Sequence, residues 1–302
     1  MISLLETILI KSRVGRYKDN AINRRLHRVG QPYGNKKEDD NNDKEATKVH
    51  NNAHRQSRRL PEFENLYKSC EELSDEQVRG FRTGQRELSE EEFSSLGGIL
   101  GRQIASVSNS NRVITSFTVK HAKSGNEFNM QSVDGNTFRD CFSIVRKFLP
   151  NGDAVDIHDN YDDCKCYISS DGLSGFAIEE DGNLVSVFSL KNGFLSACGQ
   201  KMVELGAIKL DCYRSNKQNL PAIYEHCLGF KLLAECEYSR DIMLQFNSKE
   251  YVDYFEQHYG NANVIMMGLA PNFTGKPEMF KGETGYDDAM AHRDKMLKDN
   301  GG

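Results

Sequence analysis

One stretch of the chain, residues 175–238, alternates between extended and helical patterns and restricts the fold more than any other part. Residues 176–178 and 184–190 are apolar, β-branched or aromatic runs. They are joined by Asp181-Gly182, a dipeptide that readily adopts the positive φ angles of a tight turn. This segment therefore predicts a β-hairpin.

The segments that follow the hairpin change period several times. Their apolar residues recur either at helical spacing or in short continuous runs, and glycines mark the ends of the helices. The predicted segments are a helix over 194–205, a strand over 207–212, a helix over 220–227 and a strand over 231–238. This order predicts an α+β protein with a mixed, mostly antiparallel sheet and helices on both faces.

The order of elements and two short runs resemble the core of the GCN5-related N-acetyltransferases. The runs are Leu184-Val185-Ser186-Val187-Phe188-Ser189-Leu190, which leads into a turn and a helix, and Tyr224-Glu225-His226-Cys227-Leu228-Gly229-Phe230. In that family the second hairpin strand splays from its neighbour and binds the pantetheine arm of acetyl-CoA. The next turn binds the pyrophosphate, and a tyrosine before the Gly-Phe pair often protonates the leaving thiolate. The resemblance covers about the last two-thirds of the chain in topology and only these runs in residues.

The resemblance implies an acyl-CoA-dependent N-acetyltransferase whose acceptor amine the sequence does not identify. Its implied cofactor-binding residues are Phe188, Ser189, Leu190, Lys191, Asn192, Gly193 and Ser196. The family signature here is a basic or glutamine residue, two residues, a glycine, one residue, then glycine or alanine. In this chain Lys191 begins the run, Gly193 arrives early and the second glycine is missing. Asn192-Gly193 therefore also fits an ordinary turn before a helix.

Three residues are candidates for the acid and base of acetyl transfer. The resemblance implies Tyr224 as the general acid, although it stands one residue further from Gly229-Phe230 than in the family pattern, and a packing role is the alternative. Glu179 ends the first hairpin strand and is a candidate base or an ordinary charged turn residue. Asp211 lies inside an apolar strand, where a carboxylate must find a partner or have a perturbed pKa.

A second hypothesis belongs to another functional class. The basic Asn-rich arm, the helical region and the altered phosphate turn are similar to acetyltransferase-like modules in bacteriophage virion-associated or injected proteins. Such a module is a non-catalytic structural or binding element that is attached to a particle, to DNA or to a host protein. If the protein is cellular, the resemblance implies a cytoplasmic location. If it is phage-encoded, the resemblance implies the host cytoplasm or the virion.

The N-terminal segment differs in charge from the rest of the chain. Residues 1–60 contain 14 Lys and Arg against 7 Asp and Glu, whereas the remainder contains 25 against 37. A basic arm on an acidic body suggests nucleic-acid contact through residues 11–59. Only Tyr17 and Tyr33 could stack on bases there, so a solvated, disordered arm after a short helix within residues 1–10 is the favoured alternative.

The remaining sequence divides into three parts. Residues 60–105 predict a helical region with capping boxes at Ser74 and Ser89. Glycines at 97, 98 and 101 are expected to interrupt or end its second helix. Residues 106–270 are expected to form the α/β domain, and residues 271–302 a tail with a helix over 286–297. Further predictions inside the domain are a hairpin over 113–133, a helix over 137–148, a strand over 241–246, a helix over 249–257 and an edge strand over 264–267.

Other functional classes lack their sequence signatures. The eight cysteines predict reduced thiols in a cytoplasmic compartment, and Cys164-Lys-Cys166 is too closely spaced for a usual zinc site, so no metal is expected. Residues 1–10 do not have the features of a secretory signal, and no later run is long enough to span a bilayer. There is no nucleophile elbow, Walker loop, zinc-protease pair or dinucleotide fingerprint.

Overall fold

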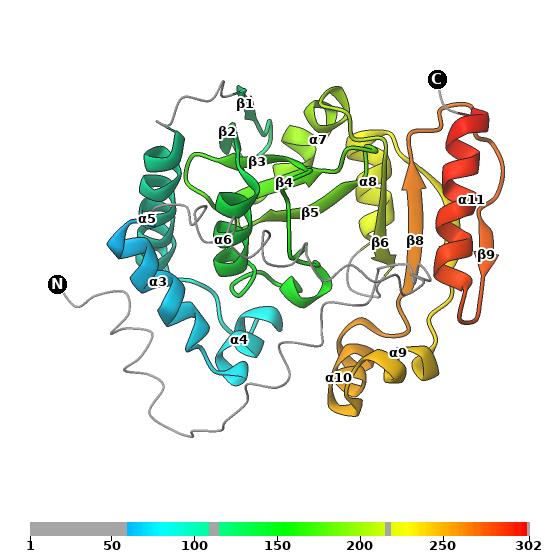
Figure 1. The fold of residues 1–302 in the computed structure, drawn as a ribbon, viewed down its shortest axis with the longest axis horizontal. Helices are drawn as coiled ribbons and strands as arrows, with labels where there is room; N and C mark the ends of the chain where they lie inside the picture. Colours follow the sequence, from blue (N-terminus) through cyan, green and yellow to red (C-terminus); the bar gives the residue numbers. More distant parts are fainter. Residues whose placement is uncertain (1–58, 109–114, 215–218, 301–302) are drawn as a thin grey trace, which may run out of the picture.

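The computed structural model describes residues 59–108, 115–214 and 219–300, which form an α+β fold with two β-sheets (Figure 1). The strands of the first sheet are antiparallel and lie in the order β1 (Ser116–Lys120), β2 (Glu127–Val133), β3 (Lys165–Ser169), β4 (Ser174–Ile178) and β5 (Leu184–Ser189). The second sheet has the order β6 (Lys209–Arg214), β8 (Asn263–Gly268), β7 (Lys231–Cys236) and β9 (Glu278–Phe280), and only β9 is parallel to its neighbour. The predicted fold class is confirmed.

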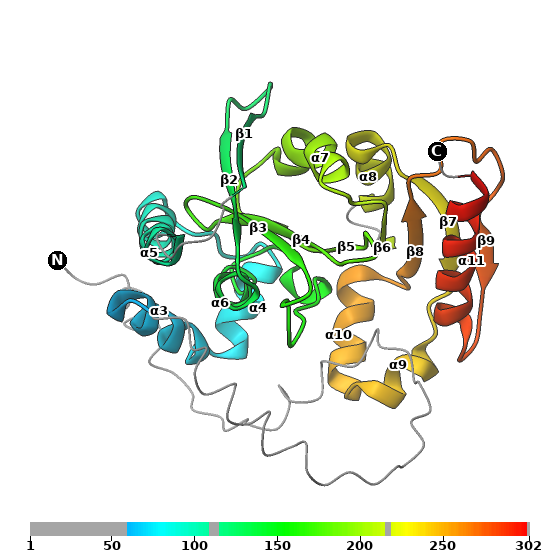
Figure 2. The ribbon, with the colours of Figure 1, turned by 45° about the horizontal axis from the view of Figure 1, so that its top comes forward.

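The described helices connect and cover these strands. They are α3 (Pro61–Glu71), α4 (Asp75–Arg82), α5 (Glu90–Ser108), α6 (Gly135–Val145), α7 (Phe194–Glu204), α8 (Leu220–Leu228), α9 (Arg240–Phe246), α10 (Lys249–Tyr259) and α11 (Gly285–Asn300), with a 3₁₀ turn at Gly152–Ala154. Figure 2 shows α6 and α10 on one side of the sheets and α7 and α8 on the other. No helix of the described part is long and apolar enough to cross a membrane.

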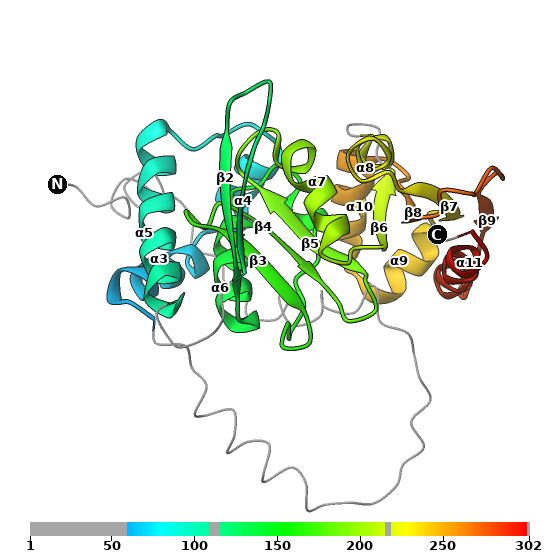
Figure 3. The same cartoon turned by 90° about the horizontal axis from the view of Figure 1, so that it is seen from above.

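In the described residues, backbone hydrogen bonds join the two sheets where β5 and β6 begin. Asn183 and Lys209 form a single parallel bridge, and the Ile208 amide donates a 2.9 Å hydrogen bond to the Gly182 carbonyl. Gly182 has φ +82°, and a Cβ atom there would lie 2.6 Å from the Ile208 side chain. Within the described residues the bridge is not continued by any β5–β6 pairing, so the two strands diverge toward their carboxyl ends (Figure 3).

Two hydrophobic cores lie on opposite faces of the first sheet. Beneath it, α6 presents Phe138 and Phe142 to Phe188 of β5, whose ring stacks on Phe142 at 4.8 Å. Above it, α7 and α8 bury Phe194 and Tyr224 in the core that also contains residues of β6 and β8. Side chains of β5 supply both cores: Val185 and Phe188 pack in the core with α6, and Leu184 and Val187 pack in the core with α7 and α8.

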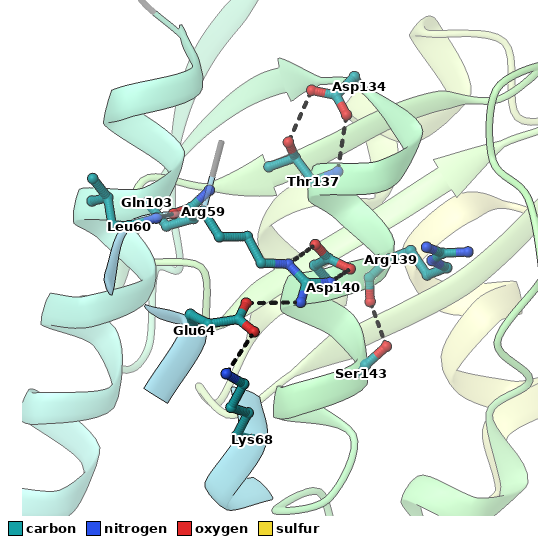
Figure 4. Close-up of polar contacts among 10 residues, drawn as sticks. All are labelled: Arg59, Leu60, Glu64, Lys68, Gln103, Asp134, Thr137, Arg139, Asp140 and Ser143. Carbon is teal, nitrogen blue, oxygen red and sulfur yellow. Dashed lines mark hydrogen bonds and ion pairs between the residues drawn. The ribbon is translucent and has the colours of Figure 1, made fainter. Parts of the chain in front are cut away.

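The helical region packs beside α6. Arg59 joins the start of α3 to α6 by two 2.9 Å hydrogen bonds to the carboxylate of Asp140, and it also donates to Glu64 of α3 (Figure 4). The predicted capping box at Ser74 is present. The expected interruption of α5 at its glycines is wrong, because these glycines permit close packing: a Cβ at Gly101 would lie 2.9 Å from the Ser170 carbonyl oxygen.

Two predictions about the C-terminal third are also wrong. Residues 240–246 form helix α9, whose amide at Ile242 is capped by the Ser239 hydroxyl. Residues 264–267 lie in β8, which is central because it pairs with both β6 and β7. The helix expected over 286–297 is confirmed as α11, which packs on the second sheet: a Cβ at Gly268 would lie 2.7 Å from Leu297. The short helix and basic arm expected over residues 1–58 lie outside the described residues.

Candidate functional site

The space where β5 and β6 diverge is marked by a bulge in β5. The ladder between β4 and β5 shifts register between Gly175 and Ala177, opposite Ser186. Ser186 has φ +51°, a left-handed conformation that is uncommon for a residue with a side chain. The bulge interrupts the ladder and turns strand backbone groups away from β4. It therefore frees part of β5 for another partner.

A loop holds the bulge in place from the α6 side. The Ser186 hydroxyl donates to the Asp156 carbonyl at 2.9 Å and therefore accepts from the Tyr161 hydroxyl at 2.6 Å. Tyr161 in turn accepts from the amide of His158 at 3.0 Å, and burial raises its pKa to about 12. The strained residue is thus fixed by a connected network rather than by packing alone.

The predicted phosphate turn lies at the carboxyl end of β5 and begins α7. Gly193 has φ +87°, and no side chain caps the first amides of the helix. Helix amides in this position attract anions. His121, from the β1–β2 turn, covers Gly193 so closely that a Cβ there would lie 2.3 Å from its ring. Asn126 of the same turn donates to the Asn192 carbonyl at 3.0 Å.

His121 is a site residue that the sequence analysis missed. Its Nδ1 accepts from the Ser124 amide at 3.2 Å, so a neutral imidazole carries its proton on Nε2. The residue comes from a hairpin far earlier in the chain. No local pattern around His121 indicates that it lies against Gly193, so the contact could be found only in the folded structure.

Three other predicted cofactor-binding residues have structural partners. Lys191 forms an ion pair with Asp171; burial alone would raise the pKa of Asp171, but Lys191 and the Ser169 hydroxyl lower it. The Ser189 hydroxyl closes the turn, accepting from the Lys191 amide at 2.9 Å. The Leu190 amide donates to the Leu173 carbonyl at 3.0 Å.

The remaining predicted cofactor-binding residues lie in different places, some in the core and some at the turn. Phe188 is buried against α6, so its side chain does not enter the space between β5 and β6. Ser196 is exposed in the first turn of α7. The structure therefore brings residues 189–193 and Ser196 together at one end of β5, while Phe188 contributes only backbone.

The candidate acid Tyr224 and the candidate base Asp211 lie on different faces of β6. Tyr224 of α8 is buried beside Cys212, and this burial strongly raises its pKa. Asp211 precedes Cys212 and therefore points to the other face, where α10 and α11 lie. Glu179 lies close enough for its charge to raise the pKa of Asp211 further. The structure thus separates Asp211 from the candidate acid.

Asp211 is the more distinctive of the two carboxylates. Its side chain is exposed to solvent, yet the protein around it is dense enough that desolvation raises its pKa, against the opposing effects of Arg293 and Tyr286. Glu179 instead accepts from Asn183 at 2.8 Å and faces His158 at 3.7 Å.

A separate groove of about 570 Å³ runs along α5. It is lined by the α5 glycines and by residues 170–173, and it meets the phosphate turn only at Lys191. It is therefore not the space between β5 and β6. In the ranges 59–108, 115–214 and 219–300, no group of three or more His, Cys, Asp or Glu side chains is arranged to hold a metal ion.

The chain was compared with protein-family models, with curated proteins and with solved structures, and no match was found. Its function is therefore inferred from its own geometry.

Proposed function

We propose that the protein is a divergent acyl-CoA-dependent N-acetyltransferase of the GCN5-related type. The observation that carries this proposal is the single β5–β6 bridge, followed by divergence of the two parallel strands. A bulge in β5 and an uncapped helix start at its carboxyl end accompany this divergence. Of these features, the resemblance in the sequence implies the splayed second hairpin strand and the phosphate-binding turn that follows it.

Each feature supplies one requirement of acetyl transfer. The freed backbone of β5 suits the amides of a pantetheine arm, and the first amides of α7 suit a pyrophosphate. The Nε2–H of His121 adds a donor beside Gly193. Binding in this space places the thioester between β5 and β6, close to Asp211 on one face and Tyr224 on the other.

The chemistry then follows from the two faces of β6. Asp211 accepts a proton from the acceptor ammonium, and the free amine attacks the thioester carbonyl. The new C–N bond forms and the C–S bond breaks. The departing thiolate takes the phenolic proton of Tyr224, and the second proton of the attacking nitrogen is released to solvent, from which Tyr224 is reprotonated. The raised pKa of Tyr224 keeps it protonated until this step, and the raised pKa of Asp211 makes it a stronger base than an ordinary aspartate. Glu179 is a weaker candidate base because Asn183 already occupies one of its oxygens.

Specific observations favour the alternative of a non-catalytic module in a phage virion-associated or injected protein. Lys191 is neutralised by Asp171, His121 covers Gly193 and Tyr224 is buried. In that case the flanks attach the domain to a virion, a host protein or nucleic acid, and residues 11–59 are the expected nucleic-acid contact. The described cysteines are unpaired, which fits a cytoplasmic compartment, either cellular or of a phage host.

The two functions are separated by a thiol-release assay with acetyl-CoA and primary amines. We expect Tyr224→Phe to lower kcat by about 100-fold or more without changing acetyl-CoA affinity, because only the acid of the second step is lost. Tyr67→Phe in α3 is the matched control and should leave kcat unchanged. A Tyr224→Phe variant as fast as the parent protein excludes the proposed acid, and an absence of acetyl-CoA binding favours the non-catalytic module.

A further inference from the structure

The groove along α5 lies outside the space between β5 and β6 that the proposed function uses. Its volume is about 570 Å³, and Phe93, Ala105 and Leu173 line it together with three glycines of α5. The lining residues of α5 extend from Phe93 to Ala105, which is roughly 18 Å of helix. The groove therefore offers a largely apolar surface that is as long as a short helix.

The charged side chains of the groove already have partners. Arg102 donates to both carboxylate oxygens of Glu62, and Lys191 forms an ion pair with Asp171. A charged small molecule would have to displace these partners, whereas the surface between them is mainly side-chain carbon and glycine backbone. Removing such a surface from water favours an apolar occupant.

Gly98 makes part of this surface accessible to a close neighbour. Cβ atoms added at Gly97 and Gly101 would meet residues 170–173, at 3.1 and 2.9 Å. Within the described residues, a Cβ at Gly98 would meet only the end of the Arg102 side chain, at 3.4 Å. Because Gly98 has no side chain, a second helix can approach the α5 backbone closely at this position.

The chain enters the described part of the structure on α5 itself. The Leu60 amide donates to the side-chain oxygen of Gln103 at 2.8 Å. Residues 11–58, 48 in number, lead toward this point, and a coil of that length spans roughly 40 Å, about twice the length of the groove. Residues 1–10 are therefore within reach of the groove of their own chain.

Residues 1–10 have the composition that the groove favours. Seven of these ten residues are apolar, which makes them the longest apolar run among residues 1–58. Ile2, Leu5 and Leu9 share one face when the run is helical. A helix over residues 2–9 is roughly 12 Å long and fits within the length of the groove.

The charges beside the groove give a docked helix its direction. Lys11 and Arg13 closely follow the apolar run, and Glu90 and Glu91 are exposed on α5 one turn before the groove begins. Opposite charges meet when the end of the run lies at the start of α5. The two helices are then antiparallel.

We propose that residues 2–9 form a helix that docks in the α5 groove of its own chain, antiparallel to α5 and with Leu5 against Gly98. A tether within one chain gives an effective concentration on the order of millimolar, which favours this arrangement over docking in a second copy at micromolar concentration. The docked helix holds Lys11 and the basic residues after it beside the acidic start of α5. The inference does not depend on acetyl transfer, and its test involves no cofactor.

The test places p-benzoylphenylalanine, an apolar photo-reactive residue, at position 5 of the full chain. After irradiation, peptide mass spectrometry identifies the residues to which position 5 is cross-linked. We expect the principal cross-links to join it to residues 93–105 of the same chain. A mixture of isotopically labelled and unlabelled protein separates cross-links within one chain from those between copies. Cross-links between copies, cross-links mainly to other surfaces, or no cross-link to residues 93–105 would overturn the inference.

Two variants of α5 show whether the groove itself holds the run. Gly98→Phe fills the groove and should lower the yield of this cross-link by at least about 5-fold, because the docked helix would be overpacked. Ser106→Phe, an exposed change on α5 outside the groove, is the matched control and should leave the yield unchanged. A Gly98→Phe protein that keeps the parent yield contradicts docking in this groove.

Two variants of the run make the test independent of the folding of α5. Leu9 lies on the apolar face of the predicted helix and Thr7 on the opposite face. With the photo-reactive residue at position 5, we expect Leu9→Glu to lower the yield by at least about 10-fold, because docking would bury a carboxylate. Thr7→Glu adds the same charge and should leave the yield unchanged. Equal yields from these two variants would show that the apolar face does not enter the groove.

Discussion

Ser186 shows how a single residue is adapted to the site. Its left-handed backbone costs an L-residue about 1–2 kcal/mol, and the hydroxyl bonds to Asp156 and Tyr161 offset this cost. Strain that the surroundings maintain is typical of functional positions. At Ser186 it interrupts the ladder between β4 and β5, which resumes at Phe188.

The pH dependence of stability tests the environment of Asp211. The folded-state pKa is raised, so below the ordinary pKa of 3.8 both states are protonated and Asp211→Asn should leave the unfolding free energy unchanged. As pH rises through the folded pKa, the folded protein must ionise a desolvated carboxylate and loses stability. We therefore expect Asp211→Asn to be more stable than the parent protein near neutral pH and equally stable below pH 3.8. Denaturant unfolding in these two pH ranges measures both.

Asp159→Asn is the control for this measurement, because Asp159 is exposed and its side chain has no contact in common with Asp211. It should shift stability little at either pH. A variant of Asp211 that is less stable than the parent protein near neutral pH would show that the carboxylate makes a favourable interaction instead.

Two glycines with the same backbone conformation give a matched test of the phosphate turn. Gly193 and Gly229 have φ +87° and +75°, but only at Gly193 would a Cβ meet another group, the His121 ring at 2.3 Å. Gly229→Ala should therefore cost about 1–2 kcal/mol from the backbone alone. Gly193→Ala should lower the unfolding free energy by more than this, and adding His121→Ala to the Gly193→Ala variant should recover the difference. Equal costs in thermal or denaturant unfolding would show that His121 does not pack on this turn.

The residues of the candidate site also show which of its features could be predicted from the sequence. Asp211 was recognisable as an unusual carboxylate because it interrupts an apolar strand, and Gly193 because Asn-Gly precedes a helical pattern. His121 and Arg293 were not recognisable, since each reaches the site through the packing of a distant element. The face to which Tyr224 points was also undetermined, because it depends on how α8 lies on β6.

At the scale of elements, local chemistry decided which predictions succeeded. The Asp-Gly turn of the β4–β5 hairpin and the capping boxes at Ser74 and Ser89 act within a few residues, and all three are present. The glycines of α5 misled the prediction because close packing, which favours them there, is a tertiary effect. Residues 240–246 became helical where their apolar pattern suggested a strand, and Arg240 joins that helix to α10 through ion pairs with Asp253 and Glu256.

One ion pair at the junction of the helical region with the domain can be tested directly. Asp140→Ala removes the two carboxylate oxygens of α6 that accept from Arg59 and leaves the partly buried guanidinium with Glu64 and the Tyr67 ring. We expect a loss of about 2–3 kcal/mol of unfolding free energy, less than for a fully buried pair because Arg59 retains some solvent contact. Glu64→Gln, which removes the more exposed partner, should cost at most about 1 kcal/mol. Similar losses in the two variants, measured by denaturant unfolding, would contradict this role of Asp140.

At the scale of the whole molecule, the second sheet completes the site with distant parts of the chain. β8 inserts between β6 and β7, and α11 brings Tyr286 and Arg293 to the face that carries Asp211. This arrangement could not be predicted from sequence, because strand order and helix placement depend on contacts between segments far apart in the chain. The order of elements, which follows from local patterns, was sufficient to predict the fold class but not this face of the site.

The central claim is that acetyl-CoA binds where β5 and β6 diverge, with its phosphates at the start of α7. Calorimetric titration of acetyl-CoA into the full chain and into Ser196→Glu tests it most directly, because Ser196 is exposed and the new carboxylate would meet the phosphates without straining the fold. Gln200→Glu, an exposed change farther along α7, is the control of equal charge. We predict one micromolar site that Ser196→Glu weakens by at least about 10-fold and Gln200→Glu leaves intact. No heat from a folded parent protein, or equal binding by both variants, would contradict the claim.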